Sequence, residues 1–188
     1  MLINPEHEPT EGSMQDELHG LLSLRNNEPI VPNIYVYAWE SDLLSVTRAG
    51  YVHEFEIKIS RADFKHDAKK REKHDVLRTG KAYSWTYYES VARKRTVIEE
   101  AETHITKRRP NYFWYACPQG MVSAKEVPEY AGLIEIEIGQ SYYHHNRTKP
   151  APLLHREKIT PRQIQSIDRS FSFKYWRMRR MYNDAVSS

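Results

Sequence analysis

Two short apolar runs joined by a tight turn, within residues 40–59, constrain the fold of this chain more than any other stretch. The first run, residues 42–47, reads DLLSVT, and the second, residues 51–59, reads YVHEFEIKI. Residues 48–50, with the sequence RAG, separate them. Strand-like runs on either side of a glycine-containing turn predict a β-hairpin.

The second run alternates charged and apolar residues. Strand side chains point to opposite faces with a period of two. Glu54, Glu56 and Lys58 therefore share one face of the predicted strand, and the apolar residues between them share the other. A hairpin can bring Asp42, at the start of the first run, close to Glu56 and Lys58 at one end of a sheet.

This combination of side chains suits one kind of chemistry. Two carboxylates, here Asp42 and Glu56, can hold a hard divalent cation such as Mg²⁺ through oxygen. Such a cation polarises a phosphate and lowers the pKa of a bound water, and a lysine beside it can stabilise the developing charge. The alternative is an edge hairpin with a solvated face, on which Glu56 and Lys58 form a weak ion pair.

The pattern Asp42, then Glu56-Ile57-Lys58, resembles the signature of the PD-(D/E)XK nucleases of the restriction-endonuclease-like superfamily. Further stretches between about residues 34 and 138 are similar to small phage and bacterial members thought to act in DNA repair or recombination. These stretches are residues 56–64 (EIKISRADF), the lysine-rich helix that follows, residues 110–115 (PNYFWY) and residues 127–134 (VPEYAGLI). The chain departs from the signature at Ser41, where the family has proline.

The resemblance implies an α/β fold with a central mixed β-sheet flanked by helices. It implies Mg²⁺- or Mn²⁺-dependent hydrolysis of DNA phosphodiester bonds, as in DNA processing, repair or recombination. Asp42, Glu56 and the backbone carbonyl of Ile57 would hold the metal, and Lys58 would assist the attacking water. The alternative is an inactive nuclease-fold module that binds nucleic acid or a protein partner.

Three further polar residues are candidates for accessory roles at such a site. In the resembled fold, a helix before the hairpin often contributes an acid, which makes Glu17 a candidate. Glu40 lies two residues before Asp42, on the same strand face. Gln119 follows the strand predicted at residues 112–117. Each of the two glutamates has an ordinary alternative as a solvated side chain.

Charge and size limit the possible partners. The 188-residue chain has a formal net charge of +3, which says little, but its basic residues are clustered and interleaved with aromatics. Such patches fit a protein that binds DNA phosphates, although each cluster could equally be an ordinary solvated face. The candidates for DNA contact are Lys69, Lys70, Lys73, His74, Arg93, Lys94 and Arg95.

The remaining pattern predicts a single domain. We expect a loose arm over residues 1–12, a helix over 14–26 capped by Ser13, a helix from Ser60 to about Arg78, and a helical insertion within 79–109. A buried strand over 112–117, a strand over 132–138 and an amphipathic helix over 160–184 follow. The strand over 132–138 alternates from residue 134, which suggests an edge of the sheet. The last helix, begun by Thr160-Pro161, would pack on the core or on a second subunit, so a homodimer is possible.

Nothing in the sequence predicts a membrane protein. No stretch approaches the ~20 apolar residues that span a bilayer, and the N-terminus lacks the pattern of a secretory signal. The single cysteine excludes an internal disulfide. The expected location is therefore the cytoplasm of a bacterium or of a phage-infected host cell.

Overall fold

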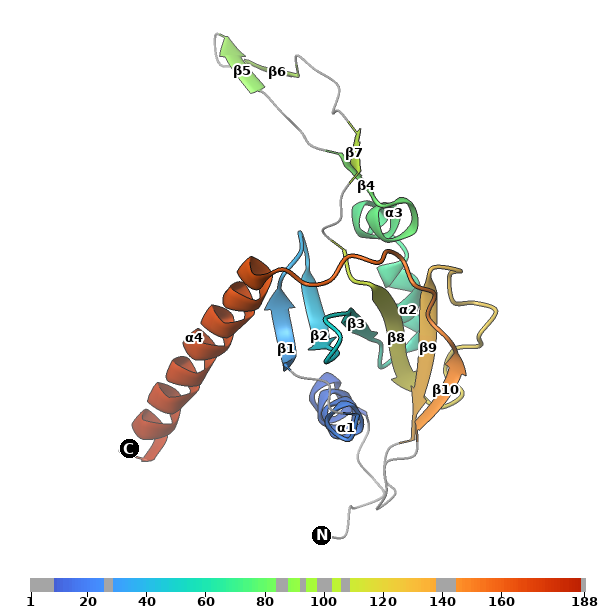
Figure 1. The fold of residues 1–188 in the computed structure, drawn as a ribbon, viewed down its shortest axis with the longest axis vertical. Coiled ribbons are helices and arrows are strands. Elements are labelled where there is room, and N and C mark those ends of the chain that lie inside the picture. Colours follow the sequence, from blue (N-terminus) through green and yellow to red (C-terminus); the bar gives the residue numbers. More distant parts are fainter. Residues whose placement is uncertain are drawn as a thin grey trace.

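A six-stranded mixed sheet organises the computed structural model, which describes residues 9–25, 29–83, 88–91, 94–97, 103–105, 109–137 and 145–186 (Figure 1). The strand order is β1-β2-β3-β8-β9-β10. The neighbours β3, β8 and β9 run parallel, and the outer pairs are antiparallel. The sheet strands are β1 (Ile30–Tyr35), β2 (Glu40–Val46), β3 (Val52–Ile57), β8 (Tyr112–Pro118), β9 (Ala131–Ile136) and β10 (His145–Lys149). The described residues form four helices, so the α/β class and the mixed sheet are as predicted.

The predicted hairpin is confirmed as β2 and β3. The two strands pair antiparallel from Val46↔Val52 to Leu43↔Phe55. Gly50 closes the turn with a φ of +84°, which favours glycine, and its N–H donates to the carbonyl of Thr47.

Helix α1 (Glu11–Ser23) covers one face of the sheet. Its buried residues, spaced three or four apart, are Met14, Leu18, Leu21 and Leu22. They pack against Leu43, Phe55 and Trp114. The helix begins earlier than predicted because Thr10, not Ser13, is the N-cap. Ser13 is the third helical residue, and its side chain completes the capping box with Thr10.

Two short helices cover the opposite face, where the sequence predicts one. They are α2 (Arg61–Asp67), capped by Ser60, and α3 (Arg71–Thr79), which ends at Gly80 in the left-handed conformation. Leu77 of α3 packs against Phe113 and Tyr115 of β8. The break at residues 68–70 lets both Asp67 and Lys70 reach the same cluster of charged side chains above the sheet.

The prediction of a helical insertion within residues 79–109 is wrong for the described residues. They form two small antiparallel sheets, one of β4 (Lys81–Tyr83) with β7 (Thr103–Ile105) and one of β5 (Tyr88–Val91) with β6 (Lys94–Val97). The segment is rich in threonine, valine, isoleucine and tyrosine, which favour strands. That preference outweighs the approximate helical spacing of its apolar residues.

The aromatic run at residues 112–118 is a buried interior strand, as predicted. The next strand, β9, was predicted to be an edge and is not one, because β10 pairs with it on its outer side. The sequence of β10 is polar (HNRTK) and gives no apolar signal for a strand.

The C-terminal helix α4 (Pro161–Val186) is confirmed. Thr160 caps it by accepting a hydrogen bond from the N–H of Gln163. Ile167 is buried in a cluster with Val31 and Ile34 of β1. Figure 1 shows the rest of the helix running away from the sheet.

Candidate active site

The hairpin opens at Asp42. The β2–β3 ladder ends at Leu43↔Phe55, and beyond it the Asp42 carboxylate replaces the backbone as the partner of β3. Asp42 Oδ2 accepts a hydrogen bond of 2.8 Å from the N–H of Ile57. The N–H and C=O of a strand residue point to the same side, so the Ile57 carbonyl also faces the Asp42 side of β3.

Glu56 and Lys58 lie beside this opening. Lys58 Nζ is 3.0 Å from Glu56 Oε1, and both side chains are buried. Burial, together with the charge of Glu56, raises the pKa of Asp42 to about 7. The structure therefore brings together Asp42, Glu56 and Lys58, as predicted, with Asp42 half-buried and with Glu56 and Lys58 in the interior and not on a solvated face.

A buried lysine from α3 reaches the same carboxylates. Lys73 is 6% exposed; its Nζ lies 3.2 Å from Glu54 Oε1 and also pairs with Glu56 Oε2. Trp39 donates a hydrogen bond of 2.7 Å to the same Glu54 oxygen. Burial alone would lower the pKa of Lys73, but the two carboxylates raise it. The prediction that Lys73 lines an open, DNA-facing surface is thus wrong.

Lys70 approaches from the break between the two helices. Its Nζ is 3.1 Å from Glu56 Oε1 and 2.9 Å from Asp67 Oδ1. Its side chain is 52% exposed, whereas those of Lys58 and Lys73 are 6% and 5% exposed. Of the three ammonium groups around Glu56, that of Lys70 is therefore the one that solvent or a ligand can reach.

Asp67 links the cluster to α3 and β8. Its Oδ2 accepts a hydrogen bond of 2.8 Å from the Tyr115 hydroxyl and lies 3.1 Å from His74 Nε2. The other ring nitrogen of His74 is 2.9 Å from the Tyr130 hydroxyl. Burial opposes ionisation of Asp67, but these hydrogen bonds, chiefly that with His74, hold its pKa far below the usual range. His74 is thus part of an internal network and was predicted instead to contact DNA.

The cluster contains more acids than bases. It joins three lysines to five carboxylates, namely Asp42, Glu54, Glu56, Asp63 and Asp67. Burial raises the pKa of Glu54 as well as that of Asp42. Carboxyl groups therefore outnumber ammonium groups at the hairpin, and the ion pairs of the described lysines involve Glu54, Glu56, Asp63 and Asp67 but not Asp42.

The donor set at the opening fits a hard divalent cation. Two carboxylates and a backbone carbonyl offer only oxygen, and Mg²⁺ commonly uses one or two carboxylates and keeps several waters. A cation would also favour ionisation of Asp42, which burial and the charge of Glu56 oppose. Within the described part of the chain, no group of three or more His, Cys, Asp or Glu residues is arranged to hold a metal by itself.

The accessory candidates lie elsewhere. Glu17 is on α1, which packs on the other face of the sheet. The α1 side chain that reaches the hairpin is Gln15, which donates to the Asp42 carbonyl at 2.9 Å. Glu40 is exposed at the start of β2 and hydrogen-bonds with Tyr35. Gln119 is exposed in the turn after β8.

The other predicted DNA contacts are only partly described. Lys69 is exposed between α2 and α3. Arg93 lies outside the described residues, and Lys94 and Arg95 belong to β6, where the backbone alone is described.

The sequence offered signals for three residues whose place in the cluster was not predicted, namely Glu54, Lys70 and Lys73. Glu54 shares the face of Glu56 by simple alternation. Lys70, Lys73 and Leu77 follow helical 3-4 spacing, so the apolar Leu77 marks the side of α3 that faces the sheet. Lys73 is buried on that side, and Lys70, at the N-cap, reaches the same cluster from an exposed position. No local pattern marks Asp67 or Trp39, which reach the cluster only through the tertiary fold.

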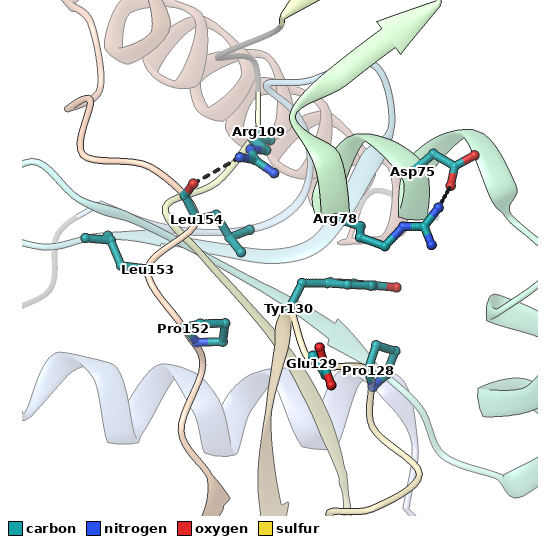
Figure 2. Close-up of a pocket in the computed structure, with 9 residues that line it drawn as sticks. All are labelled: Asp75, Arg78, Arg109, Pro128, Glu129, Tyr130, Pro152, Leu153 and Leu154. Carbon is teal, nitrogen blue, oxygen red and sulfur yellow. Dashed lines mark hydrogen bonds and ion pairs between the residues drawn. The ribbon is translucent and has the colours of Figure 1, made fainter.

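A hollow of about 680 Å³ lies beside Tyr130, whose hydroxyl contacts His74 (Figure 2). Its lining residues are Asp75, Arg78, Arg109, Pro128, Glu129, Tyr130, Pro152, Leu153 and Leu154. Arg109 donates to the Leu154 carbonyl at 2.9 Å, and Arg78 pairs with Asp75 at 2.8 Å. The connection to the carboxylate cluster runs through Tyr130 and its contact with His74.

Comparison with known proteins supports the fold alone. No protein-family model matches the chain, and no curated protein matches it. A solved structure of a protein of unknown function, SPO1766 from Silicibacter pomeroyi, is similar over 97% of both chains, with a TM-score of 0.56 and 16% sequence identity.

Among the described residues, there is no helix with the length and apolar character needed to cross a membrane.

Proposed function

We propose that this protein is a metal-dependent nuclease that hydrolyses DNA phosphodiester bonds. The observation that carries the proposal is the opening of the hairpin, where the Asp42 carboxylate binds the Ile57 backbone beside Glu56 and Lys58. A solvated edge hairpin would leave Glu56 and Lys58 exposed, yet they are 1% and 4% exposed. Buried charges of this kind are costly to keep and cluster at functional sites.

Each residue has a role in this proposal. Asp42, Glu56 and the Ile57 carbonyl would hold Mg²⁺ or Mn²⁺, which would supply Lewis-acid activation of the phosphodiester. Lys58 would orient the attacking water and offset negative charge on the phosphate. Lys70, the exposed lysine of the cluster, would meet the DNA backbone as it enters.

The direct test is cleavage of labelled single-stranded, duplex and branched DNA with Mg²⁺, Mn²⁺ or EDTA. We expect metal-dependent cleavage that falls by at least about 100-fold in Asp42→Asn and in Lys58→Ala. Two exposed residues supply matched controls, Asp16→Asn and Lys125→Ala, which should retain full activity. Undiminished cleavage in both site variants would refute the assignment.

One observation favours a second candidate, a nuclease-fold module that binds nucleic acid or a protein without cleaving. Glu56 is paired with three lysines, Lys58, Lys70 and Lys73, which already neutralise it. A Mn²⁺ titration of the protein separates the candidates. A cation that binds the site stabilises the folded state by mass action, so a rise in melting temperature that Asp42→Asn abolishes supports the nuclease. Salt-sensitive DNA binding without this rise supports the binding module.

A further inference from the structure

Helix α4 carries a stripe of large apolar side chains that are exposed in the described part of the chain. Every residue from Tyr175 to the last described residue, Val186, is exposed. The stripe consists of Ile164, Phe171, Tyr175, Met178 and Tyr182, which are 38%, 57%, 45%, 64% and 68% exposed. Their 7-4-3-4 spacing places them on one side of the helix. Contiguous exposed apolar surface of this kind marks an interaction site.

Two contacts anchor α4 to β1 along one edge of the stripe. Ile167 is buried against β1, and Lys174 Nζ donates to the Pro32 carbonyl at 2.6 Å and to that of Asn33. Ile167 and Lys174 lie on a side of the helix adjacent to the stripe, seven residues apart. Beyond these anchors, the second half of α4 runs away from the sheet (Figure 1).

The stripe itself is uncharged, although the helix is strongly basic. Arg162, Arg169 and Arg180 lie on the far side of the helix, by the periodicity of 3.6 residues per turn. A partner that packs on the stripe must therefore present an apolar surface and not anionic groups. This argues against a nucleic-acid backbone as the occupant of this face.

A second copy of α4 complements the stripe when the two helices run antiparallel. With Ile164 of one copy opposite Tyr182 of the other, Phe171 falls opposite Tyr175. Asp168 and Arg179 lie on the same flank of the stripe, and in this register they fall opposite one another within one residue. Flanking charges of opposite sign are what set orientation in paired helices, and the two-fold symmetry makes the pair occur twice.

The stripe supplies a large part of the apolar surface that a homodimer needs. At about 200 Å² per aromatic side chain, the exposed fractions of Phe171, Tyr175 and Tyr182 leave roughly 350 Å² of aromatic surface on each copy. Ile164, Met178 and the flanking residues add to this, toward the ~800 Å² per partner of a standard interface. We propose that α4 is a dimerisation helix, whose stripe packs antiparallel against the same stripe of a second copy of this chain.

The test is the mass of the protein in solution, measured by light scattering and by sedimentation over a range of concentrations. We expect a dimer whose dissociation constant rises at least about tenfold in Met178→Glu, because a buried unpaired carboxylate is costly. Phe173→Glu is the matched control, since Phe173 is equally exposed, at 65%, but lies on the opposite side of the helix. It should leave the dissociation constant within about twofold.

A charge exchange tests the register independently of folding. Asp168→Arg should weaken the dimer, and the added change Arg179→Asp should restore it. A wild-type protein that is monomeric at all concentrations, or a dimer that Phe173→Glu weakens as much as Met178→Glu, would overturn the proposal. Binding of the monomer to lipid vesicles through the stripe would overturn it as well.

Discussion

The two faces of strand β3 are both covered by helices but differ in chemistry. On one face, His53, Phe55 and Ile57 lie in an aromatic and aliphatic layer under α1. On the other, Glu54 and Glu56, together with Lys58 just beyond the strand, lie in a layer of charges under α2 and α3. Both layers are buried, yet one is held by apolar packing and the other by paired charges.

This difference separates stability from function. The layer under α1 stabilises the fold by removing apolar surface from water. The charged layer adds little net stability, because the cost of desolvating ions offsets most of their attraction. A buried charged layer that adds little stability is consistent with a role in binding or catalysis. The predictions that follow test whether the apolar layer and the charged layer differ in this way.

The largest expected effect comes from removing one cation of the charged layer. Lys73→Met leaves Glu54 and Glu56 buried with less compensation, so we expect a loss of about 3–5 kcal/mol in the free energy of unfolding. Urea denaturation measures it. Lys69→Met, at an exposed lysine nearby, should change it by less than about 0.5 kcal/mol.

A double variant checks the cause of that loss. Adding Glu54→Gln to Lys73→Met removes one of the two stranded carboxylates, so the pair should lose less than the two single variants together. Strict additivity of the two losses would show that Lys73 acts through packing and not through its charge.

The apolar layer should respond to a cavity. Leu18 is fully buried in α1, and Leu18→Ala should lower the free energy of unfolding by about 3 kcal/mol. Because Leu18 lies on the other face from the carboxylates, Mn²⁺ binding by the folded variant should not change. A large change in Mn²⁺ affinity would mean that the two layers are coupled.

His53 makes the apolar layer sensitive to pH. Burial, followed by the charges of Arg147 and Arg25, lowers the pKa of His53 to about 4, and its Nδ1 accepts a hydrogen bond of 3.0 Å from Trp114 Nε1. The neutral ring is therefore favoured in the folded state, while the unfolded ring binds a proton near pH 6.5. The contribution of His53 to the free energy of unfolding is therefore fully present above pH 6.5. It is lost progressively as the pH falls toward 4, by up to about 3 kcal/mol.

Urea denaturation at several pH values checks this prediction. His53→Gln keeps an acceptor for Trp114 but does not titrate, so its stability should fall less steeply between pH 6.5 and 4. Parallel curves for the variant and the wild type would assign the acid sensitivity to other groups.

The smallest effect on stability is expected at Lys70. Its half-exposed ion pairs are worth about 1 kcal/mol or less. If a divalent cation binds at Glu56, it competes with this ammonium group, so Lys70→Met should raise Mn²⁺ affinity roughly fivefold, which corresponds to about 1 kcal/mol. Isothermal titration with Mn²⁺ measures it, and unchanged or weaker binding would show that Lys70 does not compete for the site.

The sequence predicts the parts of this structure that local rules control. Alternation and a glycine turn predict the hairpin, 3-4 spacing predicts α1 and α4, and an uninterrupted aromatic run predicts the buried strand β8. The same rules place Asp42, Glu56 and Lys58 together, since their positions follow from one turn and a period of two.

The failures share a physical cause. Lys73 and His74 were predicted to contact DNA at the surface, because charged helical residues are usually exposed. They are buried because α3 packs over the carboxylates of Glu54, Glu56 and Asp67, which pair with them. Those carboxylates come from other elements, so no local pattern reveals the pairing. The same holds for β10, a polar strand that exists because β9 offers it an edge.

The order of strands along the chain has a consequence for how the protein folds. The hairpin closes a short loop, whereas β3 pairs with β8 only after the chain has passed through α2, α3 and the β4–β7 segment. Short loops close faster and more cheaply than long ones. We therefore expect the hairpin to form before β3 pairs with β8, and Lys73 of α3 to meet Glu54 and Glu56 only after the hairpin has formed.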